Sequence, residues 1–208
     1  MYALGIDLGT TWTAAAVWRD GRAEIATLGA SAFSVPSVVL AEPDGELVVG
    51  EAAAARALSS PQLVAREFKR RFGQDVPYLL GDREISPAQL TGALLSWVLR
   101  TVTAREGEPP GRVALTVPAT WGAHLVDSLV EVAAAAGAPE AVIVREPAAA
   151  AIHYAARTRV SAGTTIGVYD FGGGTFDAAV LRKTATGFEL LGTPEGDVVG
   201  AHQVGSLE

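Results

Sequence analysis

The sequence predicts an α/β protein with a mixed sheet and flanking helices. Apolar runs of strand length alternate with helical patterns along the chain, which is typical of this class. Two β-hairpins of one design also occur, one near each end of the chain. Each joins an apolar strand to an Asp, a turn of small residues and a return strand. Hairpins add antiparallel pairs to a sheet in which helical crossovers give parallel pairs, so we expect a mixed sheet.

Composition and charge restrict the functional classes. The 208 residues are 49% hydrophobic and 19% charged, as in an ordinary globular protein. A net charge of −7 and a pI near 5.0 argue against a nucleic-acid-binding domain, which usually presents a basic face. The lack of cysteine excludes disulfides, zinc–thiolate sites and thiol catalysis. Since the sequence carries no signal peptide and no membrane-length apolar run, we expect a cytoplasmic protein without nucleic-acid or membrane partners.

The first hairpin opens the chain. An apolar strand at residues 2–6 leads into the turn, and a second strand covers residues 14–18. Asp20-Gly21 is a further turn signal, and it predicts a third strand at residues 24–28. The turn of the first hairpin reads Asp7-Leu8-Gly9-Thr10-Thr11-Trp12-Thr13.

Residues 31–104 look like an insertion of short elements. We expect strands at residues 36–40 and 47–49 around a turn, followed by a short helix at residues 51–58. Ser60 before Pro61 is an N-cap signal, and it predicts a helix that runs toward Phe72. The capping box Ser86-Pro87-Ala88-Gln89 predicts a longer helix that ends at about residue 104.

The chain then alternates between strand and helix. Residues 112–117 predict a strand, and residues 123–136 predict an amphipathic helix that Gly137 ends. A short buried strand is expected at residues 142–144. Glu146-Pro147 then starts a helix to about residue 157.

The second hairpin carries three consecutive glycines, Gly172, Gly173 and Gly174, between apolar strands at residues 166–170 and 178–181. Glycines let backbone N–H groups approach an anion closely. Asp170 and Asp177 flank the turn, and Thr175 follows the last glycine. Carboxylates beside a phosphate cradle imply a cation, and Mg²⁺ suits this set of ligands. The alternative is a tight hairpin with glycines for geometry alone, and the second copy of the design at Asp7 argues against it.

These motifs resemble the ATPase domain of the 70-kDa heat-shock protein (Hsp70) family, within the actin/hexokinase/Hsp70 superfamily. Asp7-Leu8-Gly9-Thr10-Thr11 matches the family's first phosphate motif, and residues 168–177 match its second almost letter for letter. Three further segments match in the family's order: Lys69-Arg70-Arg71-Phe72-Gly73, Val117-Pro118-Ala119 and Arg145-Glu146-Pro147-Ala148-Ala149-Ala150-Ala151.

The resemblance implies an actin-like ATPase (ribonuclease H-like) fold that is truncated. Residues 1–30 and 105–160 would form the core of lobe I, and residues 31–104 an inserted subdomain. Residues 164–208 would form an incomplete start of lobe II. We therefore expect these 208 residues alone to bind nucleotide weakly or not at all. We also expect a dimer or strand exchange near residues 160–208, because exposed strand edges invite pairing.

The resemblance also implies roles for single residues. Asp7 and Asp170 would hold Mg²⁺, and Asp177 would contact water or the metal. Lys69 would contact the γ-phosphate, and Glu146 would orient the attacking water. A one-turn shift of register would put Arg66 in place of Lys69, and a carboxylate at Glu146 is also favoured simply because a helix begins there. The phosphates would be bound by Gly9, Thr10, Thr11, Trp12, Gly172, Gly173, Gly174 and Thr175.

Two functions remain open on the sequence. The first is a chaperone whose parent protein hydrolyses ATP to ADP and phosphate, with unfolded clients and co-chaperones bound through other parts. The alternative is a nucleotide-binding assembly or regulatory module without significant turnover. Two departures from the family pattern bear on the choice. Trp12 stands where a smaller polar residue or Tyr is usual, and residues 122–126 lack the arginine that the family uses in interdomain coupling.

Overall fold

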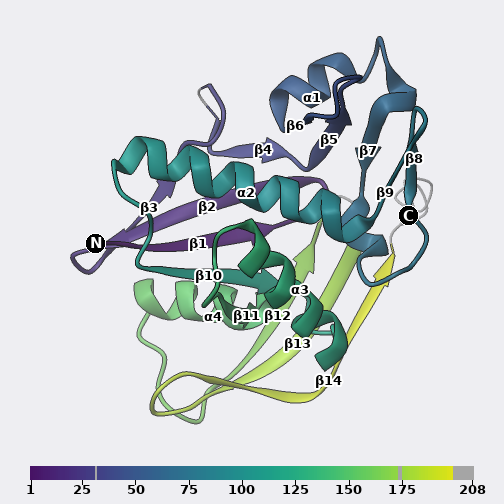
Figure 1. Ribbon diagram of the computed structural model, residues 1–208. Coiled ribbons are helices and arrows are strands. Elements are labelled where there is room, and N and C mark those ends of the chain that lie inside the picture. The colour runs from purple at the N-terminus through teal and green to yellow at the C-terminus, as the bar shows by residue number, and fades with distance from the viewer. Residues whose placement is uncertain (31, 173–174, 199–208) are drawn as a thin grey trace. The chain divides into compact units, whose positions relative to one another are not determined.

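The computed structural model describes residues 1–30, 32–172 and 175–198 (Figure 1), and the α/β prediction is confirmed. The chain divides into two compact units. The first comprises Met1–Leu115 and Ala123–Ile143, and the second comprises Thr116–Gly122 and Val144–Glu208. The boundaries expected from the sequence, with lobe I and its insertion ending at residue 160, do not coincide with these two units. They stay a prediction.

The largest sheet has the strand order β11-β10-β1-β2-β3, with β4 pairing a different part of β2 than β3 does. Strand β1 pairs in parallel with β10 and antiparallel with β2, so the sheet is mixed, as predicted. Its strands are β1 (Ala3–Leu8), β2 (Trp12–Arg19), β3 (Arg22–Ala26), β4 (Ser34–Pro36), β10 (Arg112–Val117) and β11 (Val142–Arg145).

One face of this sheet forms the core of the first unit. Alternate residues of β1 are buried, and strand register places them beside the buried residues of β2 and β10. Leu4 lies opposite Val17 and Val113, and Ile6 lies opposite Ala15 and Leu115. Because side chains alternate across a strand, Asp7 is excluded from this face and lies exposed near the end of β1.

Two long helices belong to the same unit. Helix α2 (Pro87–Glu106) begins with the predicted capping box, in which Ser86 and Gln89 satisfy each other's backbone N–H groups. It packs against α3 (Ala123–Ala136), where Gly92 approaches Val132. No helix in the described part of the chain is long and apolar enough to cross a membrane.

The expected helix from Ser60 to Phe72 is wrong. Ser60 makes no capping hydrogen bond through its side chain, and only a 3-10 turn, η1 (Pro61–Leu63), follows it. The next residues form β7 (Val64–Arg66), which pairs with β5 (Val38–Ala41). Glu67 then takes a left-handed backbone conformation, and a second 3-10 turn, η2 (Phe68–Arg71), follows. Pairing with a distant strand therefore overrides the local helix signal.

The remaining elements of the insertion are short. The expected single strand at residues 36–40 is two strands, β4 and β5, because Ser37 leaves the ladder between them. Strand β5 also pairs with β6 (Leu47–Val49), and α1 (Glu51–Arg56) packs on both strands. A separate hairpin consists of β8 (Tyr78–Leu80) and β9 (Arg83–Ile85).

The second unit is a three-stranded antiparallel sheet covered on one face by α4 (Glu146–Arg157). Its strands are β12 (Thr165–Phe171), β13 (Thr175–Lys183) and β14 (Phe188–Val198). Ala151 of the helix packs with Ala179 and Leu181 of β13, together with Val168 of β12. Strand β14 is longer than the expected strand at residues 188–191, since its pairing with β13 continues as far as Val198.

Candidate functional site

The two hairpins have the same strand register. In the first, Leu8 is the last residue of β1 to pair, and its partner is Thr13. In the second, Phe171 is the last residue of β12 to pair, and its partner is Phe176. Asp7 and Asp170 each precede that last pair by one residue. The correspondence expected from sequence therefore holds residue for residue in the strand ladders.

The turn of the first hairpin requires glycine. A Cβ atom on Gly9 would lie 2.1 Å from the backbone oxygen of Trp12, closer than any side chain tolerates. The chain therefore folds back tightly between Leu8 and Thr13. Asp7, Thr11 and Trp12 are exposed around this turn, and Thr10 is half-buried. Hydroxyl and backbone donors of this turn are thus accessible to an anion.

Ser37 braces this turn, and sequence reasoning missed it. Its hydroxyl donates to the backbone oxygen of Gly9 at 2.8 Å, and its amide donates to the backbone oxygen of Thr11 at 2.9 Å. The Thr13 hydroxyl lies 2.9 Å from the Ser37 hydroxyl, whose single proton is already used, so Thr13 donates. Ser37 and Thr13 are both buried, and together they fix the turn from beneath.

In the second hairpin two aspartates are cross-strand partners. Asp170 lies directly opposite Asp177 on neighbouring strands, with Asp170 exposed and Asp177 half-buried. Asp177 also lies close to β14, because a Cβ on Gly196 would be 2.3 Å from its Oδ1 atom. Like charges directly opposite each other repel, so this arrangement favours a bound cation. Gly173, Gly174 and the Thr175 side chain lie outside the described residues.

The other face of this hairpin carries aromatic rings. Tyr169 and Phe171 alternate with Asp170, so they lie on the opposite side of β12. Their side chains are 77% and 67% exposed, and both rings contact Phe176, with centroids 6.3 and 6.0 Å away. One face of the hairpin is thus acidic at its end, and the other is aromatic. Gly172 follows Phe171 at the start of the turn and is exposed.

Lys69 lies on η2, not on the helix that the sequence suggested. Buried Phe68 and Phe72 anchor this turn on either side of it. The neighbouring arginines have structural roles: Arg70 pairs with Glu67 at 3.0 Å, and Arg71 stacks on the Tyr78 ring. Burial raises the pKa of Tyr78, against the opposing effect of Arg71. Lys69 itself is half-buried.

Glu146 is the first residue of α4, and Arg145 before it holds a neighbouring loop. One nitrogen of the Arg145 guanidinium donates to the backbone oxygens of Pro118 at 3.1 Å and of Trp121 at 2.7 Å. The loop after β10 and the start of α4 are thereby joined within the second unit. Glu146 is half-buried, and Pro147 behind it is buried. Arg145 gives Glu146 a fixed backbone position, a role that the sequence did not reveal.

Comparison with known proteins decides the family. The model of the family described as "Hsp70 protein" matches residues 3–80 and 76–205. The chain belongs to the Hsp70 family. As an Hsp70 chain it is 36% identical over 197 residues to the chaperone protein DnaK of Elusimicrobium minutum, covering 91% of this chain and 31% of that protein. The DnaK proteins of Cenarchaeum symbiosum and Thermoplasma acidophilum are 34% and 33% identical over 196 residues, again over 91% of this chain.

This Hsp70 chain therefore spans about a third of the length of the relatives that it matches, 31% for the first. The matched region corresponds to part of a chaperone nucleotide-binding domain. Within the described residues, no three carboxylate or imidazole side chains gather as a metal site. Mg²⁺ commonly takes only one or two protein carboxylates and keeps phosphate oxygens and waters as its other ligands. One or two carboxylates, fewer than the three of such a cluster, are therefore enough to hold Mg²⁺.

Proposed function

We propose that the protein that contains this chain binds ATP with Mg²⁺ and hydrolyses it, as an Hsp70-type chaperone ATPase. The observation that carries this proposal is the shared register of the two hairpins, which puts an Asp at the same place before each small-residue turn. A tight hairpin needs glycine but does not need a carboxylate at the same register twice. A site for phosphate with Mg²⁺ uses both features: glycine lets the backbone approach the phosphate, and the carboxylate holds the cation.

Binding is assigned to the two turns. The exposed turn of Gly9, Thr10 and Thr11 would donate to one side of the phosphates, with Trp12 beside it. The glycine turn from Gly172 to Thr175 would donate to the other side. Asp7 and Asp170 would hold Mg²⁺, which when bound neutralises charge on the phosphate oxygens.

Hydrolysis is assigned to three side chains. Glu146 and Asp177 would orient the water that attacks the γ-phosphorus in line with the leaving oxygen. Lys69 would neutralise charge that develops on the transferred group, which is the main contribution a protein makes to this chemistry. The buried phenylalanines around Lys69 and the Arg145 brace beside Glu146 support these roles, because each fixes the backbone from which the side chain projects.

The experiment measures ATP binding and turnover in the longest natural polypeptide that contains this sequence. We expect Lys69→Ala and Glu146→Ala each to reduce turnover about 100-fold while ATP binding persists. Arg66→Ala is the matched control for Lys69, since Arg66 is an exposed basic residue on β7. Loss of turnover in Arg66→Ala with normal Lys69→Ala would move the role to Arg66. Normal turnover in both Lys69→Ala and Glu146→Ala would exclude this mechanism.

The same protein would act on unfolded clients with co-chaperones, in the cytoplasm. The family supports this proposal, because the relatives that the chain matches are chaperone proteins. For the 208 residues alone we propose weak or no nucleotide binding, since the chain covers only 31% of such a relative. Calorimetry with Mg·ATP tests this, and a micromolar dissociation constant would contradict it.

A second function, nucleotide-dependent assembly, is favoured by one observation. The exposed face with Tyr169 and Phe171 presents apolar rings on a sheet in which β12 and β14 are the edge strands among the described residues. Such a surface favours pairing between chains, as a dimer or by strand exchange. Light scattering that rises with protein concentration only when ATP is present would support assembly. A signal independent of ATP would exclude it as the function of the site.

A further inference from the structure

Ser37 lies between strands β4 and β5, and it holds two backbone oxygens of the first turn at once. Its hydroxyl donates to the Gly9 oxygen at 2.8 Å, and its amide donates to the Thr11 oxygen at 2.9 Å. The same hydroxyl accepts from buried Thr13 at 2.9 Å, so its own proton stays directed at Gly9. Ser37 is only 2% exposed, and both bonds are therefore made on the inner side of the turn.

These two bonds fix the direction of two amides of the turn. In a trans peptide unit the C=O and N–H groups point in opposite directions, and the described part of the chain contains no cis peptide. The Gly9 oxygen points to Ser37, so the Thr10 N–H points away from it. The Thr11 oxygen also points to Ser37, so the Trp12 N–H points away from it as well.

The outer side of the turn is open to a ligand. None of the hydrogen bonds found within residues 1–30, 32–172 and 175–198 is donated by the amide of Thr10 or Thr11. Thr11 and Trp12 are exposed, and Thr10 is half-buried. Neighbouring N–H groups with a common direction form a concavity that binds an anion. The direction of these donors is thus set by a serine that lies 28 residues beyond Gly9.

The backbone position of Ser37 is fixed on both sides. Strand β4 before it pairs with β2, and strand β5 after it pairs with β7. Strand β7 leads in turn to η2, which carries Lys69. Because these ladders involve backbone groups, the loss of the Ser37 hydroxyl would leave the support of Lys69 in place.

We propose that Ser37 is a positioning residue for phosphate, whose hydroxyl keeps the Thr10 N–H directed at the phosphates of ATP. Gly9 populates positive and negative φ alike, so the peptide unit between Gly9 and Thr10 turns over easily unless it is held. In the reversed orientation its C=O group faces the phosphate and repels it. This inference rests on the proposed nucleotide site, and it adds a residue that touches no ligand.

The test measures the affinity for Mg·ATP and for adenosine by calorimetry, in the longest natural polypeptide that contains this sequence. Ser37→Ala should raise the dissociation constant of Mg·ATP about tenfold, because a donor to a charged group is lost. The affinity for adenosine, which has no phosphate, should stay unchanged. At saturating Mg·ATP, kcat should stay within about threefold of wild type, since the groups assigned to hydrolysis are unaltered.

The outcomes distinguish this inference from the function on which it rests. Unchanged Mg·ATP affinity in folded Ser37→Ala would overturn the role of Ser37 and leave the phosphate site standing. Wild-type protein that binds Mg·ATP no more tightly than adenosine would exclude the phosphate site, and the role of Ser37 would fall with it.

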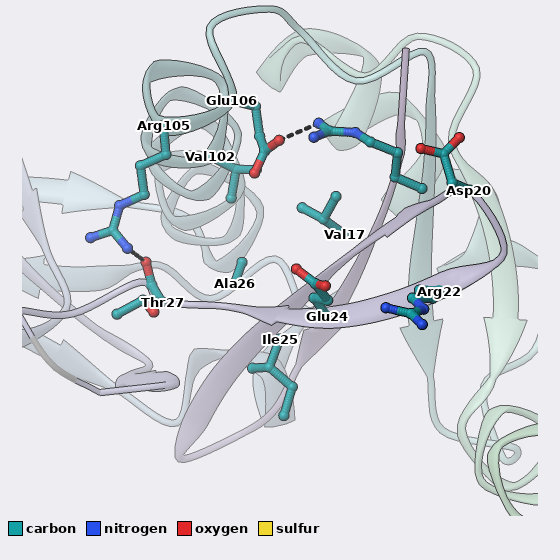
Figure 2. Close-up of a pocket in the computed structure, with 11 residues that line it drawn as sticks. Val17, Asp20, Arg22, Glu24, Ile25, Ala26, Thr27, Val102, Arg105 and Glu106 are labelled. Carbon is teal, nitrogen blue, oxygen red and sulfur yellow. Dashed lines mark hydrogen bonds and ion pairs between the residues drawn. The ribbon is translucent and has the colours of Figure 1, made fainter. Parts of the chain in front are cut away.

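Two control variants separate positioning from stability alone. Thr91 donates its buried hydroxyl to the Pro87 oxygen at 2.8 Å, a bond of the same kind and length as that from Ser37. Thr91→Val should therefore lose comparable stability in urea and keep its Mg·ATP affinity. Arg105→Ala removes the bond to the Thr27 oxygen that Figure 2 shows beside β3, and it should keep that affinity too. A loss of affinity in either control as large as in Ser37→Ala would overturn the proposal.

A readout on the wild-type protein covers the case in which Ser37→Ala does not fold. The amide hydrogens of Thr10 and Trp12 should exchange more slowly with Mg·ATP bound than with adenosine bound, because phosphate oxygens accept from them. The amides of β9 in the same unit serve as the internal reference. Bound Mg·ATP that slows exchange at none of residues 9–12 would show that these donors do not face phosphate, and it would overturn the proposal.

Discussion

Ser37 makes three hydrogen bonds under the first turn, and the residue is only 2% exposed. Replacing it by alanine leaves the Gly9 oxygen and the Thr13 hydroxyl without this partner. We expect Ser37→Ala to lower the free energy of unfolding by about 1–3 kcal/mol, because buried polar groups lose their hydrogen bonds. Urea denaturation followed by circular dichroism measures the change. Ser59→Ala, which removes one exposed hydroxyl bond to Arg56, is the control and should cost less than about 0.5 kcal/mol.

Gly9 tests whether the tight turn is a steric requirement. In Gly9→Ala the new methyl group meets backbone, not a flexible side chain, so the turn must open. We expect a loss of about 2 kcal/mol or more of stability, again from urea denaturation. Gly187→Ala is the matched control, since nothing lies within 4 Å of a Cβ placed there. Equal, small effects in the two variants would show that the turn tolerates a side chain.

At the scale of elements, two serines offered the same helix signal, and only one of them caps a helix. Ser86 accepts from the Gln89 amide, whereas Ser60 makes no capping bond. We therefore expect Ser86→Ala to cost about 1 kcal/mol of unfolding free energy. Ser60→Ala should change it by no more than about 0.3 kcal/mol. Comparable losses in both variants would contradict this assignment of the caps.

The contrast explains how much of the fold the sequence could predict. The signals that placed three helices lie within the segments themselves: the capping box of α2, the apolar spacing of α3 and the proline near the start of α4. Strand β7 exists because residues 64–66 pair with β5, more than twenty positions earlier in the chain, and no local pattern announces that partner. Glu67, the next residue, takes a left-handed backbone conformation with a φ of 55°, where the expected helix would need a helical one.

The candidate site shows the same division. The places of Asp7 and Asp170 in their hairpins were predictable, because a hairpin fixes its register over a few neighbouring residues. Ser37 and Arg145 were not, since each acts on a turn or loop more than twenty residues away. Their own residue types are ordinary in strands and helix starts. Side chains that brace a site from a distant segment become visible only once the fold brings the segments together.

At the scale of the whole molecule, two hairpins of one register lie in separate compact units. Family membership is established, and nucleotide chemistry is the proposal that gives both hairpins a purpose. The exposed aromatic face of the second hairpin is a distinct surface, on the opposite side of β12 from Asp170. An intervention at the two aspartates therefore tests the nucleotide site without altering that face.

The two substitutions are Asp7→Asn and Asp170→Asn, each made in the longest natural polypeptide that contains this sequence. The measurement is the rate of Mg·ATP hydrolysis. Each change removes one carboxylate charge and keeps the shape of the side chain. We predict that kcat/KM falls about 100-fold in both variants, while the control Asp44→Asn, in the turn before β6, behaves as wild type. Wild-type turnover in both hairpin variants would contradict the claim that the two hairpins form one phosphate and Mg²⁺ site.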